Sequence, residues 1–265
     1  MKIKGTLEKM RTSINDGLVE YILKINDSEI KLNELISKEI SFTYTGNIYC
    51  VKCGALTYKS FSQGFCYQCF KSAPETEECV LKPELCRAHK GIARDMEYAK
   101  KHCLTTQHVY ISLTSGFKVG VTRHTQIPTR WIDQGATEAI IIANTPNRYT
   151  AGVIEVELKQ HIADKTNWRK MLSSNEKSIF GVLDKKQEII NLLPSDLQKY
   201  VVDSEAVSIT YPGKICEGKI STHNFDNLPQ VSGILKGIKG QYLIFEGNSV
   251  LNIRKFGGYE VECEY

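Results

Sequence analysis

The chain has 265 residues, of which 42% are hydrophobic and 24% are charged, and its formal net charge is +4 at pH 7. This length exceeds one typical domain and is short for three independent ones. The composition is that of a chain that buries a core, which excludes a largely disordered protein. The positive charge is mild, so it permits a nucleic-acid partner without requiring one.

The sequence carries no sign of export or membrane insertion. Its first residues, MKIKGTLEKMRTS, have a charge every few positions and lack the apolar stretch of a signal peptide. The longest apolar run, AIIIA from Ala139, is far too short to cross a bilayer. We therefore expect a cytoplasmic protein without a membrane partner. In that reducing compartment its nine cysteines are expected to be metal ligands or buried thiols rather than disulfides.

The residue pattern changes along the chain and predicts an α+β protein of four consecutive segments. Stretches such as VEYILKI and ISFTYTG near the N-terminus, and GQYLIFEG near the C-terminus, are typical of strands. The end segments share a Gly-x-Leu, a Tyr followed by two aliphatics, and a Leu-Asn, which indicates either a weak internal repeat or a coincidence. The predicted segments are an N-terminal β unit (1–47), a cysteine-rich zinc-binding segment (48–105), a mixed domain (106–180), and a helix with a C-terminal β unit (181–265).

The mixed domain has the clearest element order. HVYISL and FKVGVT predict two strands joined by a TSG turn. A short helix is expected to begin after Pro128 and end at Gly135, followed by a buried strand, EAIIIAN. Ile154, Leu158 and Ile162 then repeat every four residues, which predicts a helix with one apolar face. The predicted order is therefore β-β-α-β-α.

Two CxxC pairs in YCVKCGALTYKSFSQGFCYQCF are the most specific motif of the chain. Each pair presents two thiolates from a tight turn, and four thiolates complete a tetrahedron around Zn²⁺. A redox-active CxxC motif would require only one pair, so we favour a zinc ribbon with a structural metal ion. Its ligands would be Cys50, Cys53, Cys66 and Cys69.

Several aromatic residues are interleaved with these cysteines, among them Phe61, Phe65, Tyr67 and Phe70. They fit either the miniature core of the ribbon or a platform for stacking bases. We favour the core, because a small zinc module has few other apolar groups to bury.

A second and less regular set of ligand residues follows. Cys86 and His89 have the spacing of a metal-binding turn, and with Cys79 and Cys103 they would complete a second zinc site. The alternative is that these cysteines are small buried hydrophobic residues, which is how we interpret the isolated Cys216 and Cys263. The irregular spacing leaves both interpretations open.

The motifs HVYI, KVG, TRW and AGVIE, in the order β-β-α-β-α, resemble those of the GIY-YIG endonuclease superfamily. This resemblance implies a three-stranded sheet flanked by helices. It also implies phosphodiester cleavage by a Tyr of the first strand, an Arg of the first helix, and a Glu of the next helix that holds one Mg²⁺ or Mn²⁺. Over nearly its whole length the chain also resembles a family known as domain of unknown function 2797.

Residue by residue, the resemblance assigns catalytic roles to Tyr110, Lys118, Arg130 and Glu155. Arg130 and Lys118 would neutralise the charge of the transition state, and Glu155 would hold the metal ion. Tyr110, with a lowered pKa, would orient or deprotonate the attacking water. The sequence departs from the superfamily pattern, because the first motif lacks its Gly, Lys118 replaces the second Tyr, and a longer insertion precedes Arg130. Tyr110, Glu155 and Arg130 also have structural interpretations, as a strand Tyr, a helix Glu and a capping or paired Arg.

Four further basic residues are expected to contact a nucleic-acid backbone: Arg123, Arg148, Lys165 and Arg169. Arg148 also fits a plain turn, and the stretch DKTNWRKML also fits a helix start, in which Asp164 or Thr166 is the cap. Asn167 is a loose candidate for the late Asn of the superfamily.

These patterns lead to three hypotheses for function. The first is a metal-dependent nuclease acting on DNA or RNA, with the zinc module as a substrate clamp. The second is a non-catalytic, zinc-stabilised nucleic-acid-binding protein on an inactive scaffold of the same kind. The third is a protein-interaction scaffold, which would present a large apolar surface on its terminal β units.

Overall fold

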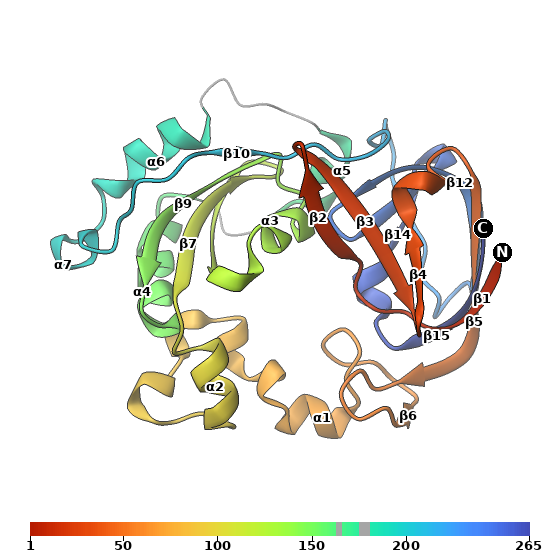
Figure 1. Ribbon diagram of the computed structural model, residues 1–265, viewed down its shortest axis with the longest axis horizontal. Helices are drawn as coiled ribbons and strands as arrows, with labels where there is room; N and C mark the ends of the chain where they lie inside the picture. Colours follow the sequence, from red (N-terminus) through yellow and green to blue (C-terminus); the bar gives the residue numbers. More distant parts are fainter. Residues whose placement is uncertain (163–165, 175–180) are drawn as a thin grey trace. The chain divides into compact units, whose positions relative to one another are not determined.

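The computed structural model describes residues 1–162, 166–174 and 181–265 (Figure 1). It is a mixed structure with several sheets and short helices, which confirms the α+β character of the predicted fold. The chain forms two compact units. The first comprises Met1–Lys71, Leu172–Ser174 and Thr210–Tyr265, and the second comprises Ser72–Met171 and Asn175–Ile209. The cysteine-rich segment therefore contributes to both units.

The first unit is built on an eight-stranded sheet that joins the two ends of the chain. Neighbouring strands are antiparallel, except that β11 is parallel to β14. In spatial order the strands are β1 (Lys2–Thr6), β15 (Tyr259–Glu264), β5 (Glu39–Tyr49), β12 (Gln230–Lys239), β13 (Tyr242–Phe245), β14 (Ser249–Asn252) and β11 (Ser221–Thr222), and β6 (Leu56–Thr57) pairs with β5.

A second sheet in this unit contains β2 (Arg11–Asn15), β3 (Leu18–Ile25) and β4 (Ser28–Lys31). Alternate residues of β3 are buried, from Val19 to Ile25, because successive side chains of a strand point to opposite faces. The predicted β character of both ends of the chain is therefore confirmed. Three single-turn 3₁₀ helices complete the unit: Leu32–Leu35, Glu246–Asn248 and Ile253–Phe256.

The second unit contains a four-stranded antiparallel sheet in the order β10-β9-β7-β8. Its strands are β7 (Gln107–Leu113), β8 (Phe117–Arg123), β9 (Glu138–Thr145) and β10 (Val207–Ser208). The observed order from β7 to α4 (Arg148–Lys159), with α3 (Thr129–Asp133) between β8 and β9, is the predicted β-β-α-β-α. The short strand β10 is an addition to the three strands that the resemblance implies.

The remaining helices are short. They are α1 (Tyr67–Ser72), α2 (Met96–His102), α5 (Trp168–Ser173), α6 (Val182–Ile190) and α7 (Ser195–Gln198). Single-turn 3₁₀ helices occupy Pro74–Thr76, Glu78–Val80, Pro83–Leu85, Ala88–Lys90 and His124–Gln126. Among the described residues, no helix combines the length and the apolar composition that crossing a bilayer requires.

Strand β7 is covered on both faces. Val109, Ile111 and Leu113 belong to the same buried cluster as Ile154 of α4. Tyr110 alternates with these residues, and its ring lies edge-on to Trp131 of α3, with 6.2 Å between the ring centroids. The sheet therefore presents one face to α4 and Tyr110 to the side of α3.

Candidate metal centres and candidate active site

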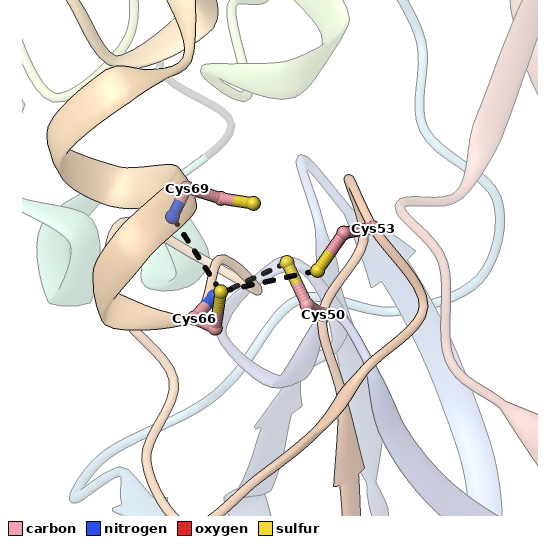
Figure 2. Close-up of side chains that lie close together, drawn as sticks. All are labelled: Cys50, Cys53, Cys66 and Cys69. Atoms are coloured by element: carbon pink, nitrogen blue, oxygen red, sulfur yellow. Dashed lines mark hydrogen bonds between the residues drawn. The ribbon is translucent and has the colours of Figure 1, made fainter.

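The first cysteine cluster, formed by Cys50, Cys53, Cys66 and Cys69, lies in the first unit (Figure 2). The four sulfur atoms lie within 4.8 Å of one another. Cys50 directly follows β5, and Cys69 lies on α1. The turn after the first pair requires Gly54, whose φ is +72°, and a side chain at Gly64 would collide with Val51. The predicted spacing thus gives a compact group of four thiols.

Backbone N–H groups prepare this cluster for a metal ion. The N–H of Cys66 donates to the Cys50 sulfur over 3.2 Å, and that of Cys69 donates to the Cys66 sulfur over 3.5 Å (Figure 2). Burial raises the pKa of the Cys50 thiol, but hydrogen bonds from the backbone of Cys66, Cys53 and Lys52 outweigh it and lower that pKa to about 6. Thiolate is the form that binds soft metal ions, so the donor set fits zinc.

The second cysteine cluster consists of Cys79, Cys86 and Cys103 in the second unit, with their sulfur atoms within 4.8 Å of one another. All three are buried. Hydrogen bonds from the Cys103 and Cys79 thiols lower the pKa of the Cys86 thiol. The pKa values of Cys79 and Cys103 are raised. Three thiols that stabilise one thiolate among them are compatible with a metal site.

His89, the fourth ligand predicted for this cluster, is not part of the group. Its ring stacks on Tyr149, with 4.5 Å between the centroids, at an exposed position. His102, the histidine next to Cys103 in the sequence, does not complete the group either, because its ring stacks on Tyr98 and its Nδ1 lies 2.9 Å from the Tyr98 carbonyl oxygen. Cys216 and Cys263 are buried, as expected, and belong to neither cluster.

Arg148 connects the second cysteine cluster to α4. Its guanidinium donates to the carbonyl oxygens of Cys79, over 3.3 Å, and His102, over 3.2 Å. Its backbone N–H donates to the carbonyl oxygen of Cys103 over 2.8 Å. Arg123 lies nearby and is half-buried, and burial lowers its pKa. Two of the four basic residues expected to contact nucleic acid therefore lie beside the second cysteine cluster.

The other two basic residues belong to the stretch DKTNWRKML. Arg169 is exposed, and its guanidinium lies 4.3 Å from the centroid of the Trp168 ring. Asn167 accepts hydrogen bonds from the backbone N–H groups of Arg169 and Lys170, so it caps the start of α5 in place of the predicted Thr166; the other predicted cap, Asp164, lies outside the described residues. Lys165 lies outside the described residues.

Tyr110 is fully buried at the centre of β7. It pairs across the sheet with Gly120, where a Cβ atom would lie 2.6 Å from the Tyr110 hydroxyl, so glycine is required there. The hydroxyl donates to Gln134 Oε1 over 3.0 Å. Burial raises the pKa of Tyr110, although the charge of Arg130 and its hydrogen bond to the hydroxyl oppose the shift. The lowered pKa expected from the sequence is therefore wrong, because desolvation outweighs the nearby guanidinium.

Glu155 is the buried carboxylate of α4, with 7% of its surface exposed. Its Oε2 lies 3.4 Å from Lys159 Nζ and makes no hydrogen bond of good geometry within the described residues. Burial raises the pKa of Glu155; Lys159 and Lys118 oppose the shift, and the carboxylate of Glu84 adds to it. The charges of Glu155 and Arg130 also act on Tyr110. Electrostatic interactions therefore link the four predicted catalytic residues, since Arg130 and Glu155 act on Tyr110 and Lys118 acts on Glu155.

Two residues of this region were not predicted from the sequence. Gln134, at the end of α3, accepts the hydrogen bond of the Tyr110 hydroxyl. Glu84 comes from the cysteine-rich segment, which packs so closely on α4 that a Cβ at Gly152 would lie 2.1 Å from the Glu84 nitrogen. The Glu84 Oε2 is buried without a hydrogen bond in the described part of the chain. No sequence pattern marks Glu84, since only the contact with α4 brings it near Glu155.

Comparison with known proteins identifies a family and no individual relative. The family model described as "Protein of unknown function (DUF2797)" matches residues 37–261. No curated protein and no solved structure matches the chain.

Proposed function

The chain belongs to this family of proteins of unknown function, and we propose, from its own residues, that it is a metal-dependent nuclease that hydrolyses phosphodiester bonds in DNA or RNA. The observation that carries the proposal is the buried Glu155 carboxylate of α4: the charges of Lys159 and Lys118 act on it, and Arg130 acts with it on Tyr110. A buried carboxylate with an oxygen that lacks a hydrogen bond, accompanied by cationic groups, suits a cation and a phosphate.

The residues fit a hard divalent cation. Glu84 and Glu155 each have a buried carboxylate oxygen without a hydrogen bond among the described residues, and their charges repel each other. Mg²⁺ and Mn²⁺ prefer oxygen ligands of this kind. When bound, the ion would supply Lewis-acid stabilisation of the phosphate oxygens.

The protein side chains would supply the remaining catalysis. Arg130 and Lys118 would balance the negative charge that accumulates on the phosphate, and Arg130 can do so with two parallel hydrogen bonds. Tyr110 is buried and its pKa is raised, which makes it a poor base. We therefore give Tyr110 a positioning role, in which its hydroxyl orients Arg130 and Gln134.

The burial of Tyr110 also favours a second candidate function, a nucleic-acid-binding protein without catalysis. A water molecule has no access to a fully buried hydroxyl, and the superfamily resemblance places this Tyr at the attacking water. In this alternative the two cysteine clusters stabilise a binding protein, and the nuclease-like unit is an inactive scaffold.

For both cysteine clusters we propose a structural zinc ion. The first cluster offers four thiols and the second offers three, and thiolates at this spacing select zinc over hard cations. Metal analysis of the purified protein is expected to find two equivalents of zinc per chain. A single equivalent that is lost in Cys50→Ser would restrict the proposal to the first cluster.

One experiment separates the two functions. The zinc-loaded protein is incubated with labelled single-stranded, duplex and branched nucleic acids, with and without Mg²⁺ or Mn²⁺. The comparison uses Glu155→Gln and, as a matched control on the same helix, the half-buried Glu157→Gln. The nuclease proposal expects metal-dependent cleavage that Glu155→Gln reduces by at least a hundredfold and Glu157→Gln leaves unchanged. Cleavage by both variants would reveal a contaminant, and binding without cleavage would support the second function.

A further inference from the structure

Aromatic side chains around the first cysteine cluster face solvent rather than a core. Tyr58 is 101% exposed, Tyr67 is 52% exposed and Phe70 is 37% exposed. Phe61 and Phe65 are only half-buried. The expectation that these rings form the core of the ribbon is therefore met only in part. Scattered exposed apolar residues are common, but several large rings on one small module indicate an interaction surface.

Three of these rings form a contiguous patch. The Phe61 ring lies 5.4 Å from the Tyr67 ring and 5.7 Å from the Phe70 ring, the latter with an interplanar angle of 23°. We call Phe61, Tyr67 and Phe70 the aromatic patch. Each of these rings is attached to a backbone that the cysteine cluster holds in place, since Cys66 and Cys69 lie on either side of Tyr67.

Lysines stand at the faces of these rings. Lys59 Nζ lies 5.4 Å from the centroid of Phe61, and Lys71 Nζ lies 5.6 Å from that of Tyr67. The sequence contains no Asp or Glu between Glu39 and Glu75. The four thiolates around a zinc ion carry a net negative charge, which these lysines and Lys52 offset. The aromatic patch thus presents flat apolar faces beside the positive charges of Lys59 and Lys71, and this stretch of the sequence has no Asp or Glu that would repel an anion.

We propose that the aromatic patch, with Lys59 and Lys71, binds single-stranded nucleic acid. Bases of a single strand would stack on the rings, and the lysines would contact the adjacent phosphates. A duplex keeps its base faces covered, so it would gain only the lysine contacts. The inference deepens the proposed function by naming single-stranded nucleic acid as the substrate. It rests on that function only for the claim that the bound strand is cleaved.

The test measures binding apart from cleavage. Fluorescence anisotropy follows labelled 12-mer single strands of DNA and RNA, and the matching duplexes, against the zinc-loaded full chain without added Mg²⁺ or Mn²⁺. The variants are Tyr67→Ala, Tyr67→Phe and Lys59→Ala. The control is Leu228→Ala, which removes a side chain that is 56% exposed in the same unit but outside the module.

We expect Tyr67→Ala to weaken single-strand binding by about tenfold, because stacking of one base on an aromatic ring contributes roughly 1–3 kcal/mol. Tyr67→Phe keeps the ring and is expected to bind like the unchanged protein. Lys59→Ala is expected to lower the slope of log K against log salt by about 0.7, the value for one phosphate contact on a single strand. Leu228→Ala is expected to have no effect.

Zinc content and circular dichroism verify that each variant is folded. Equal binding by Tyr67→Ala and the unchanged protein would overturn the inference, as would equal loss in Tyr67→Ala and Tyr67→Phe. Duplex binding as tight as single-strand binding would also overturn it. Binding that depends on Tyr67 without any cleavage would leave the inference standing and refute the nuclease. Metal-dependent cleavage, with binding and cleavage both unchanged in Tyr67→Ala, would support the nuclease and refute the inference about the aromatic patch.

Discussion

The two cysteine clusters differ in the way that the chain builds them. The first takes its four thiols from residues 50–69, around two turns, and includes the exposed Cys53. The second takes three buried thiols from distant positions: Cys79 lies in the 3₁₀ helix Glu78–Val80, Cys86 follows the 3₁₀ helix Pro83–Leu85, and Cys103 follows α2. Arg148 binds the backbone of the second cluster to the helix that carries Glu155. The first cluster therefore links residues that are close in the sequence, whereas the second links distant residues and contributes to the packing of its unit.

This difference predicts unequal consequences of losing one thiol. Cys86→Ser is expected to remove one zinc equivalent and destabilise the second unit by several kcal/mol, because structural zinc binding contributes about 10–16 kcal/mol of folding free energy in small modules. Cys53→Ser is expected to remove one equivalent as well, with loss of structure confined to residues near 50–72. Metal analysis with hydrogen exchange distinguishes the two patterns. Global unfolding of the Cys53→Ser variant would contradict the claim that the first cluster stabilises only its own segment.

A second prediction concerns the packing of the cysteine segment on α4. Gly152→Ala places a Cβ 2.1 Å from the Glu84 nitrogen, so the two backbones must separate. We expect a loss of about 1–3 kcal/mol, the usual range for overpacking. Gly116→Ala is the matched control, because nothing lies within 4 Å of a Cβ there. Thermal or denaturant unfolding measures both, and equal stabilities for the two variants would contradict the close contact.

A third prediction follows from the raised pKa of Glu155. The folded protein holds this proton more tightly than the unfolded chain does, so stability is highest below the ordinary pKa of Glu and falls as pH rises through the raised pKa. Glu155→Gln is therefore expected to stabilise the metal-free second unit by about 1 kcal/mol at neutral pH, since it removes a buried charge that lacks a full set of hydrogen bonds. The gain should vanish near pH 4, as denaturant titrations at several pH values can show. A destabilised variant at pH 7 would indicate that the ion pair with Lys159 governs this site.

The smallest effect is expected at the exposed rings of the first cluster. Tyr67→Ala is predicted to change the free energy of unfolding by less than about 0.5 kcal/mol, because substitutions of exposed residues seldom do more. Zinc content should also be unchanged. A larger loss, measured by denaturant unfolding, would mean that the aromatic patch holds the module together and would weaken its assignment as a binding surface.

The sequence predicts most of the structural features that are formed by residues close together in the chain. The two CxxC pairs predict the first cluster because all four ligands lie within twenty residues, and turn geometry alone brings them together. The strands and helices between His108 and Glu155 follow from alternation, the TSG turn and the cap at Gly135, whose φ is +70°. Period and turn chemistry are properties of neighbouring residues, so one chain is enough to show them.

What depends on distant contacts could not be predicted. His89 was expected to bind metal, but its orientation depends on Tyr149, sixty residues later. The pKa of Tyr110 was expected to be low, but its side chain is fully buried on the side of α3, where it contacts Trp131 and Gln134. Glu84 was not predicted, because it comes near Glu155 only through the close contact of its backbone with Gly152 of α4. In each case a partner far away in the sequence decides the chemistry.

The pairing of β5 with β15 has a consequence for synthesis of the chain. The Thr45 hydroxyl binds the Glu260 carbonyl, 215 positions later, and β15 is also the neighbour of β1. A ribosome that adds about 5–20 residues each second needs roughly 10–40 s to make that distance, so β1 and β5 emerge long before their partner exists. During this interval their unpaired edges are open to aggregation, and the nascent chain is a natural client for a chaperone that shields extended segments.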